Sequence, residues 1–125
     1  MHTDLKGKSS FHPKRLLSSF RFAGNGLRLA LCEPNMRVHI AAGIFISAAG
    51  FIFDLTRMEW CVLLLTITGV ISLEMVNTAI EKTVDLVTEE YKPLAKMAKD
   101  LAAGAVLIFA IAAIIIGGLL FIPKF

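Results

Sequence analysis

A stripe of polar side chains lies inside one hydrophobic stretch of this sequence. It consists of Glu74, Asn77, Glu81 and Asp85, at offsets of three, seven and eleven residues from the first. At ~100° per helical residue these offsets return to within about 80° of one another, so all four side chains leave one face of a helix. A carboxylate inside a membrane span costs roughly 2.5 kcal/mol or more and is normally paired, hydrated or functional. The stripe is therefore the first candidate for a site that does chemistry.

Further charged residues are expected to converge with the stripe at the membrane surface. Glu33 precedes one apolar segment, and Lys99 and Asp100 precede another. Carboxylates beside lysines suit Mg²⁺ held together with nucleotide phosphate, because Mg²⁺ takes one or two protein carboxylates and completes its shell with phosphate and water. Phosphoryl transfer then needs positioning, charge neutralisation and a base for the attacking hydroxyl.

Structural interpretations stand beside this chemistry. The acidic pair at 89–90 is also typical of the solvated end of a helix. Glu74 is alternatively a buried carboxyl group that is hydrogen-bonded to Asn77 or Ser72. His39 is more typical of an interfacial helix residue than of a ligand.

The elements that must position these residues are membrane helices. The chain has 125 residues, of which 56% are hydrophobic, and its mean hydropathy is +0.71, well beyond ordinary soluble domains. Three segments, at 38–54, 59–80 and 101–122, are long enough to cross a bilayer. No signal-peptide pattern is visible before them, so all three are expected to remain. The sequence predicts a single all-α integral membrane domain.

The segment before the first span predicts an amphipathic helix over 14–33, after a flexible tail at 1–13. Leu16, Phe20 and Leu27 share one helical face, and basic residues spaced seven apart lie roughly 120° from it. Such a helix lies on the membrane surface, with its apolar face turned toward the lipid.

Basic residues predict the orientation. Seven Lys or Arg residues precede the first span, one lies between the first two spans, four lie between the second and third, and one follows the third. Because basic loops stay on the cytoplasmic side, the N-terminus and the second loop are expected to face the cytoplasm of an inner membrane. The net charge of +3 is then explained by membrane orientation and by attraction to anionic lipid. Nucleic acid is not an expected partner.

The run SLEMVNTAIEKTVDLVTEEYKPLAKMAKDLAAGAVLIFA carries two specific motifs, ExxNTAIExxVD and AKDxxAGAV. These motifs resemble those of the small prokaryotic membrane lipid kinases, the diacylglycerol and undecaprenol kinase family. The resemblance extends over about residues 15–124. Within the family, the combination of EW, SLE, NTAIE, TVDL, PLAK and AAGAV is more similar to the undecaprenol kinases of Gram-positive type.

The resemblance implies a homotrimer whose active sites are shared between subunits, with Mg²⁺ as cofactor and ATP as co-substrate. It assigns Glu74 as the general base, with Ala103 beside it in substrate binding, Glu33 and Glu81 as metal ligands, and Asp85 as a supporting residue. The implied nucleotide-binding residues are Arg15, Phe22, Glu33, Asn77, Glu81, Glu90, Tyr91, Lys92, Lys99 and Asp100.

The expected function is therefore the transfer of the ATP γ-phosphoryl group to undecaprenol at the cytoplasmic membrane surface. A diacylglycerol kinase is the alternative within the family, because no residue unambiguously distinguishes one lipid alcohol from another. A proton or cation transporter would also use intramembrane carboxylates, but it should carry polar groups in more than one span and usually an internal repeat. A non-enzymatic assembly protein would not need the carboxylates to converge.

Overall fold

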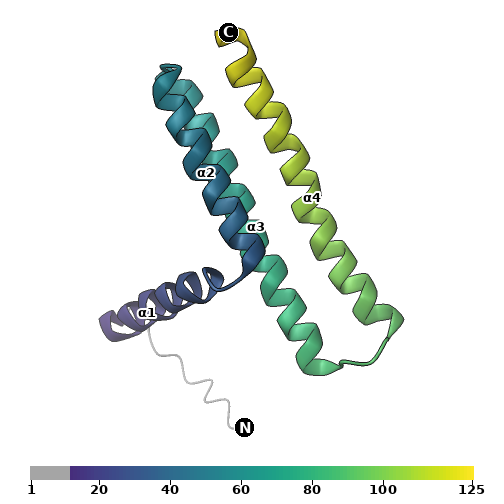
Figure 1. Cartoon of the computed structure of the whole chain (residues 1–125). Coiled ribbons are helices and arrows are strands. Elements are labelled where there is room, and N and C mark those ends of the chain that lie inside the picture. The colour runs from purple at the N-terminus through teal and green to yellow at the C-terminus, as the bar shows by residue number, and fades with distance from the viewer. Residues whose placement is uncertain (1–11) are drawn as a thin grey trace.

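The computed structural model describes residues 12–125, and the regular structure in that part of the chain is helical (Figure 1). The tail is expected at residues 1–13; residues 1–11 lie outside the described residues, and Pro13 already belongs to the first helix. Three of the helices are long and apolar enough to cross a membrane. This confirms the all-α membrane fold with an N-terminal helix and three spans. The elements are α1 (Pro13–Ala30), α2 (Pro34–Ile52), α3 (Arg57–Val87), α4 (Pro93–Phe121) and a short 3₁₀ helix, η1 (Ile122–Lys124).

Local sequence signals explain where the helices begin. Pro13, Pro34 and Pro93 stand at the first turns of α1, α2 and α4, where proline loses no hydrogen bond and its fixed φ suits the helix. α3 begins with a capping box, in which the Thr56 N–H donates to Glu59 Oε2 at 2.8 Å and the Glu59 N–H donates to Thr56 Oγ1 at 3.3 Å. Each pairing satisfies a backbone N–H that the helix leaves free.

α3 and α4 are longer than the spans expected from hydropathy. With 31 and 29 residues, they measure roughly 46 and 44 Å at 1.5 Å per residue, against a hydrocarbon core of about 30 Å. Only residues 88–92 connect them outside helical structure. The polar stretch at 81–100 therefore forms the two helix ends that extend beyond the apolar region.

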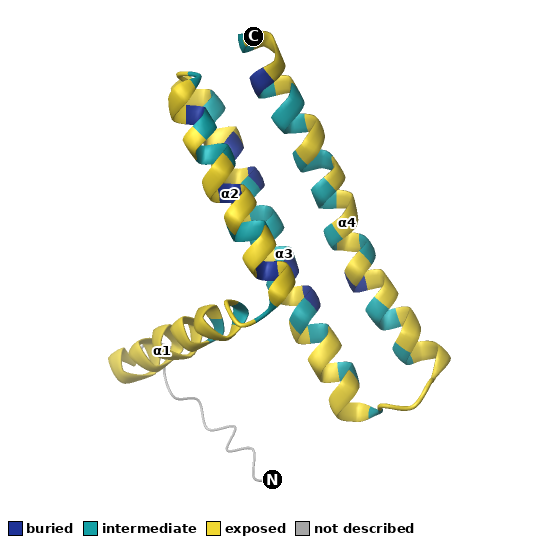
Figure 2. Ribbon diagram, viewed as in Figure 1, coloured by how far each residue is buried: buried dark blue, intermediate teal, exposed yellow. Residues whose placement is uncertain are grey.

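α3 lies between α2 and α4 and packs against both (Figures 1 and 2). Glycines permit the close approach. A Cβ atom on Gly43 of α2 would lie 3.0 Å from Ile67 Cγ2 of α3, and one on Gly69 of α3 would lie 2.3 Å from Phe109 Cζ of α4. The absence of side chains at these two positions thus sets both helix separations.

The α2–α3 turn and the end of α4 meet at one end of the long helices. Leu55, Leu63 and Phe121 form a buried cluster there. Asp54 completes the turn with a φ of 56°, in the left-handed region that Asp tolerates better than most residues. Lys124 Nζ lies 3.1 Å from Glu59 Oε2 and ties the last turn of the chain to the start of α3.

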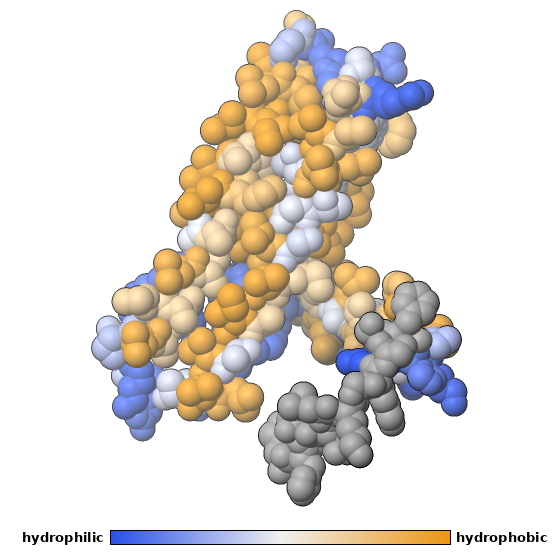
Figure 3. Space-filling model, turned by 180° about the vertical axis from the view of Figure 1, so that it is seen from behind, coloured by the Kyte–Doolittle hydropathy of each residue, from blue (hydrophilic) through white to orange (hydrophobic). Residues whose placement is uncertain are grey.

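Most of the apolar surface remains uncovered within one chain. Only 6% of the apolar window of α4 is buried, and Leu16, Phe20 and Leu27 of α1 are all more than half exposed. Figure 3 shows apolar residues over the middle of the long helices and hydrophilic residues gathered toward their ends. This distribution suits a bilayer around the long helices and a lipid surface against α1.

Candidate active site

The polar stripe continues the packed face of α3. Leu63, Thr66, Glu74 and Asn77 are the buried residues of this helix, and their spacing of three, eight and three residues keeps them on one face. Glu74 is 4% exposed and stands about 26 Å from the start of α3, inside the hydrocarbon zone near the far boundary. The stripe therefore begins buried in the bundle and runs toward the α3–α4 turn.

Glu74 meets a histidine from the neighbouring helix. Its Oε2 atom lies 3.7 Å from His39 Nε2 of α2. The distance is that of an ion pair when the imidazole is protonated, and it is longer than a hydrogen bond. The hydrogen bond to Asn77 considered for Glu74 from the sequence is absent among the described contacts, because Asn77 turns its amide elsewhere.

Asn77 donates from Nδ2 to Glu81 Oε1 at 3.2 Å, one helical turn along α3. Its other polar atom, Oδ1, is buried and has no hydrogen-bond partner. A buried acceptor without a donor is unfavourable by about 1–3 kcal/mol, so such groups call for a partner that the isolated chain does not supply. The amide oxygen beside the Glu81 carboxylate is a suitable ligand for a hard cation or its water.

Glu33 is engaged by a lysine of the stripe helix. Lys82 Nζ lies 2.9 Å from Glu33 Oε1. Glu33 is the N-cap residue of α2, so this contact joins the start of α2 to α3 one residue beyond Glu81. The two carboxylates assigned to metal binding thus stand on neighbouring helices near the same helix end.

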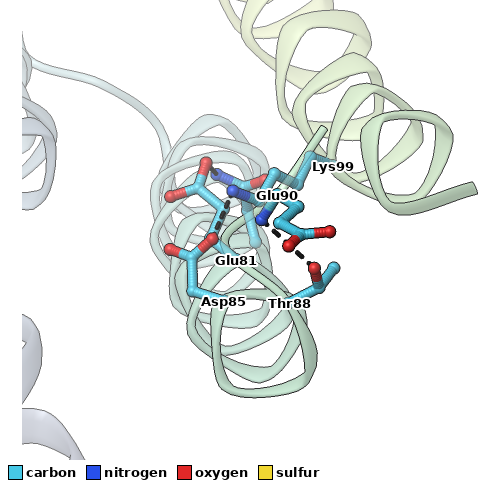
Figure 4. Close-up of polar contacts among 6 residues, drawn as sticks. Glu81, Asp85, Thr88, Glu90 and Lys99 are labelled. Atoms are coloured by element: carbon cyan, nitrogen blue, oxygen red, sulfur yellow. Dashed lines mark hydrogen bonds and ion pairs between the residues drawn. The ribbon is translucent and has the colours of Figure 1, made fainter. Parts of the chain in front are cut away.

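Two lysines of α4 form ion pairs with Asp85 and Asp100. Lys99 pairs with Asp85 across the α3–α4 seam, and Lys96 pairs with Asp100 one turn further along its own helix. Figure 4 shows Lys99 reaching from α4 toward Asp85, with Glu90 close by in the turn. These charges lie near the α3–α4 turn, which is the end that the sequence predicts to face the cytoplasm.

A cleft of about 370 Å³ opens at the α3–α4 turn. This volume falls in the range of small-molecule sites. The structure brings four of the expected nucleotide-binding residues together here: Glu90, Tyr91, Lys92 and Lys99, beside Val84, Thr88, Glu89, Ala95 and Lys96. The sequence interpretation missed Lys96, although its position three residues before Lys99 already placed both on one face of α4.

Other expected residues stand apart from this cleft. Arg15 and Phe22 are exposed on α1, which projects away from the long helices on the side opposite α4 (Figure 1). Ala103 is exposed on α4, next to the buried Ala102. A single chain therefore does not assemble every residue that the family resemblance assigned to the site.

The carboxylates expected to converge do not form one compact metal-binding group within a single chain. Across residues 12–125, no group of three or more His, Cys, Asp or Glu side chains could hold a metal ion. Glu33, Glu74, Glu81, Asp85 and Asp100 each contact a different side chain instead of one another. The donor set still fits Mg²⁺ delivered with nucleotide, because this ion needs only one or two protein carboxylates and Asn77 Oδ1 remains without a partner.

The chain is similar in sequence to known prokaryotic lipid kinases. The family described as prokaryotic diacylglycerol kinase matches residues 21–121. The chain is 49% identical to an undecaprenol kinase of Bacillus subtilis over 88% of this chain and 90% of that protein. It is 46% identical to a diacylglycerol kinase of Synechocystis over 86% of this chain, which spans 63% of that protein. A diacylglycerol kinase of Helicobacter pylori is 33% identical over 76% of this chain and 75% of that protein.

Proposed function

The chain belongs to the prokaryotic diacylglycerol kinase family, and we propose that this membrane lipid kinase phosphorylates undecaprenol with ATP. The observation that carries the proposal is the buried Glu74 on α3, one turn from Asn77 and its unpaired oxygen. A buried carboxylate at this depth can meet a hydroxyl group that arrives from the bilayer. The identity of 49% to an undecaprenol kinase supports the choice of acceptor.

Glu74 acts as the general base in this proposal. The acceptor oxygen attacks the γ-phosphorus of ATP, a new P–O bond forms, the bond to the β-phosphate oxygen breaks, and ADP leaves. The hydroxyl proton passes to the Glu74 carboxylate. Because such a transfer involves little further covalent chemistry, placement of the two substrates supplies most of the catalysis.

The cleft at the α3–α4 turn is the proposed nucleotide site. Lys99 and Lys92 line it with Tyr91, so cationic groups and an aromatic ring are available for phosphates and base. Glu81 and Glu33 would hold Mg²⁺ on the phosphate side of the nucleotide. When bound, the ion would neutralise charge on the β- and γ-phosphates.

The arrangement supports a cytoplasmic site. α1 and the α3–α4 turn lie at the same end of the long helices, opposite the α2–α3 turn (Figure 1). Both carry the concentrations of Lys and Arg that favour the cytoplasmic side. We place the N-terminus and the nucleotide cleft on the cytoplasmic face of the inner membrane.

A homotrimer is the proposed assembly. The apolar window of α4 is only 6% buried, and polar groups of the stripe need shielding from lipid. Arg15, Phe22 and Ala103, which stand apart from the cleft within one chain, would then reach the site of a neighbouring subunit. Chemical cross-linking of the protein in membranes should give dimers and trimers and no larger species.

The deciding experiment uses the purified full-length protein with ATP, Mg²⁺ and undecaprenol in mixed micelles, followed by analysis of the lipid product. The expected product is undecaprenyl phosphate. A parallel reaction contains diacylglycerol at the same mole fraction. Preference for diacylglycerol would mean that the enzyme makes phosphatidic acid. Absence of any phosphorylated lipid would contradict the proposed function.

Diacylglycerol remains the second candidate acceptor because relatives at 46% and 33% identity carry that name. The kinase family disfavours the cation transporter considered from the sequence. Both lipid alcohols present a hydroxyl group at the membrane surface, so Glu74 would have the same role with either one.

A further inference from the structure

Glu74 has an unusual polar environment for a buried carboxylate. Its side chain is 6% exposed, and among residues 12–125 its ion-pairing contact is with His39 Nε2. Asn77, which shares its helical face, donates to Glu81 instead. Burying a carboxylate is costly unless a hydrogen-bonding or charged partner accompanies it. His39 is therefore the group that α2 contributes to the buried base.

Closely packed residues flank His39 along α2. Met36, one turn earlier on the same face of α2, is 1% exposed. Gly43, one turn later, lets the α2 backbone approach α3 so closely that an added Cβ would lie 3.0 Å from Ile67 Cγ2. The α2 backbone on both sides of His39 is thus held close to α3. A side chain carried on such a fixed backbone can orient a catalytic group.

We propose that His39 is the positioning residue for Glu74, an inference that rests on the proposed function. The Nε2–H group donates toward the Glu74 carboxylate and orients the other oxygen for the acceptor hydroxyl. The hydroxyl O–H bond breaks and its proton goes to Glu74, while His39 keeps its own proton. The separation of 3.7 Å in the free chain is expected to shorten with substrates bound, as catalytic hydrogen bonds commonly do.

The test compares two amides of different reach. In His39→Gln the amide nitrogen stands near the original Nε2 position, whereas in His39→Asn it stands near Nδ1 and falls short of Glu74. The matched control is His12→Gln, because His12 is exposed and makes no side-chain capping bond. All proteins are full-length and are assayed with undecaprenol and MgATP in the same micelles.

We expect His39→Gln to keep kcat within about threefold of wild type and His39→Asn to lower it by roughly 10–100-fold, because a small misplacement of a catalytic group can cost about 10²-fold in rate. The KM for ATP should stay within about twofold in both variants, since the nucleotide cleft is not touched. Equal kcat values for the Gln and Asn variants would overturn the inference. So would a loss that appears only in the KM for ATP.

A second readout does not depend on activity. In ¹⁵N-histidine-labelled protein, Glu74→Gln should shift the His39 imidazole resonances and leave those of His12 unchanged. An unchanged His39 signal would overturn the inference. Failure of the wild type to phosphorylate any lipid alcohol would instead overturn the proposed function, so the two failures are distinguishable.

Discussion

Lys82 Nζ lies 2.9 Å from Glu33 Oε1 and joins the start of α2 to α3 one residue beyond Glu81. In the proposed reaction Glu33 is a ligand of Mg²⁺. The ammonium group of Lys82 thus stands where the positive charge of the metal would act. In this proposal, binding of MgATP replaces the Lys82 ammonium group beside Glu33 with Mg²⁺.

This exchange predicts that Lys82→Gln lowers the Mg²⁺ concentration needed for half-maximal activity. The pair is largely exposed to solvent, and because water and salt weaken such pairs, the shift should not exceed about fivefold. Magnesium titrations at fixed ATP measure it. An increased Mg²⁺ requirement would mean that Lys82 supports the bound nucleotide rather than competing with the metal.

Removal of either proposed metal ligand should abolish most activity. Glu33→Gln and Glu81→Gln keep the side-chain shape but lose the charge that would hold the ion with ATP. The control is Asp54→Asn, at the opposite end of the helices, where Asn accepts the left-handed backbone. Activity at several Mg²⁺ concentrations and elution on gel filtration are measured for all three. Near-normal turnover of both Gln variants at ordinary Mg²⁺ would contradict the assignment.

Glu74→Gln separates the proposed base from the ligands. Loss of a general base typically lowers the rate by ~10²–10⁴-fold, whereas MgATP binding should stay within a few-fold of wild type because the nucleotide cleft lies beyond Glu81. Single-turnover assays and equilibrium nucleotide binding give the two quantities. Loss of binding with unchanged catalysis at saturating ATP would make Glu74 a ligand or a structural carboxyl group.

The cleft residue Lys99 should contribute to nucleotide affinity. Lys99→Gln removes a cationic group that lines the cleft and also its contact with Asp85. Charge-assisted contacts of this kind are worth about 1.5–3 kcal/mol, so the Kd for ATP should rise by roughly 10-fold or more. Lys124→Gln at the far end of the helices is the control. Equal ATP affinities in the two variants would mean that the nucleotide does not bind in this cleft.

A stability prediction concerns the contact between α3 and α4. A Cβ at Gly69 would lie 2.3 Å from Phe109 Cζ, so Gly69→Ala should destabilise the protein by about 1–3 kcal/mol through overpacking. Phe109→Leu in the same chain should recover part of the loss by making room. Thermal unfolding of the purified variants in one detergent measures both effects. An additive loss in the double variant would exclude a steric origin.

The fold followed from sequence because its causes are local. Apolar stretches long enough to cross a bilayer must become helices, since no other open structure satisfies the backbone in lipid. Prolines at 13, 34 and 93 and the Thr56–Glu59 capping box then mark where the helices begin. Hydropathy underestimated the lengths of α3 and α4. Their charged ends extend into the interface, so these ends are helical but are not counted in an apolar stretch.

The spacing of Glu74, Asn77, Glu81 and Asp85 likewise determined that they share one face of a helix. Which partner each one meets was decided only by tertiary structure. From the sequence alone, His39 was interpreted as an interfacial histidine, and Lys82 was only one of several basic residues. They reach Glu74 and Glu33 because Gly43 lets α2 lie close against α3. Such contacts depend on the separation and rotation of two helices, and these are set by packing between residues far apart in the chain.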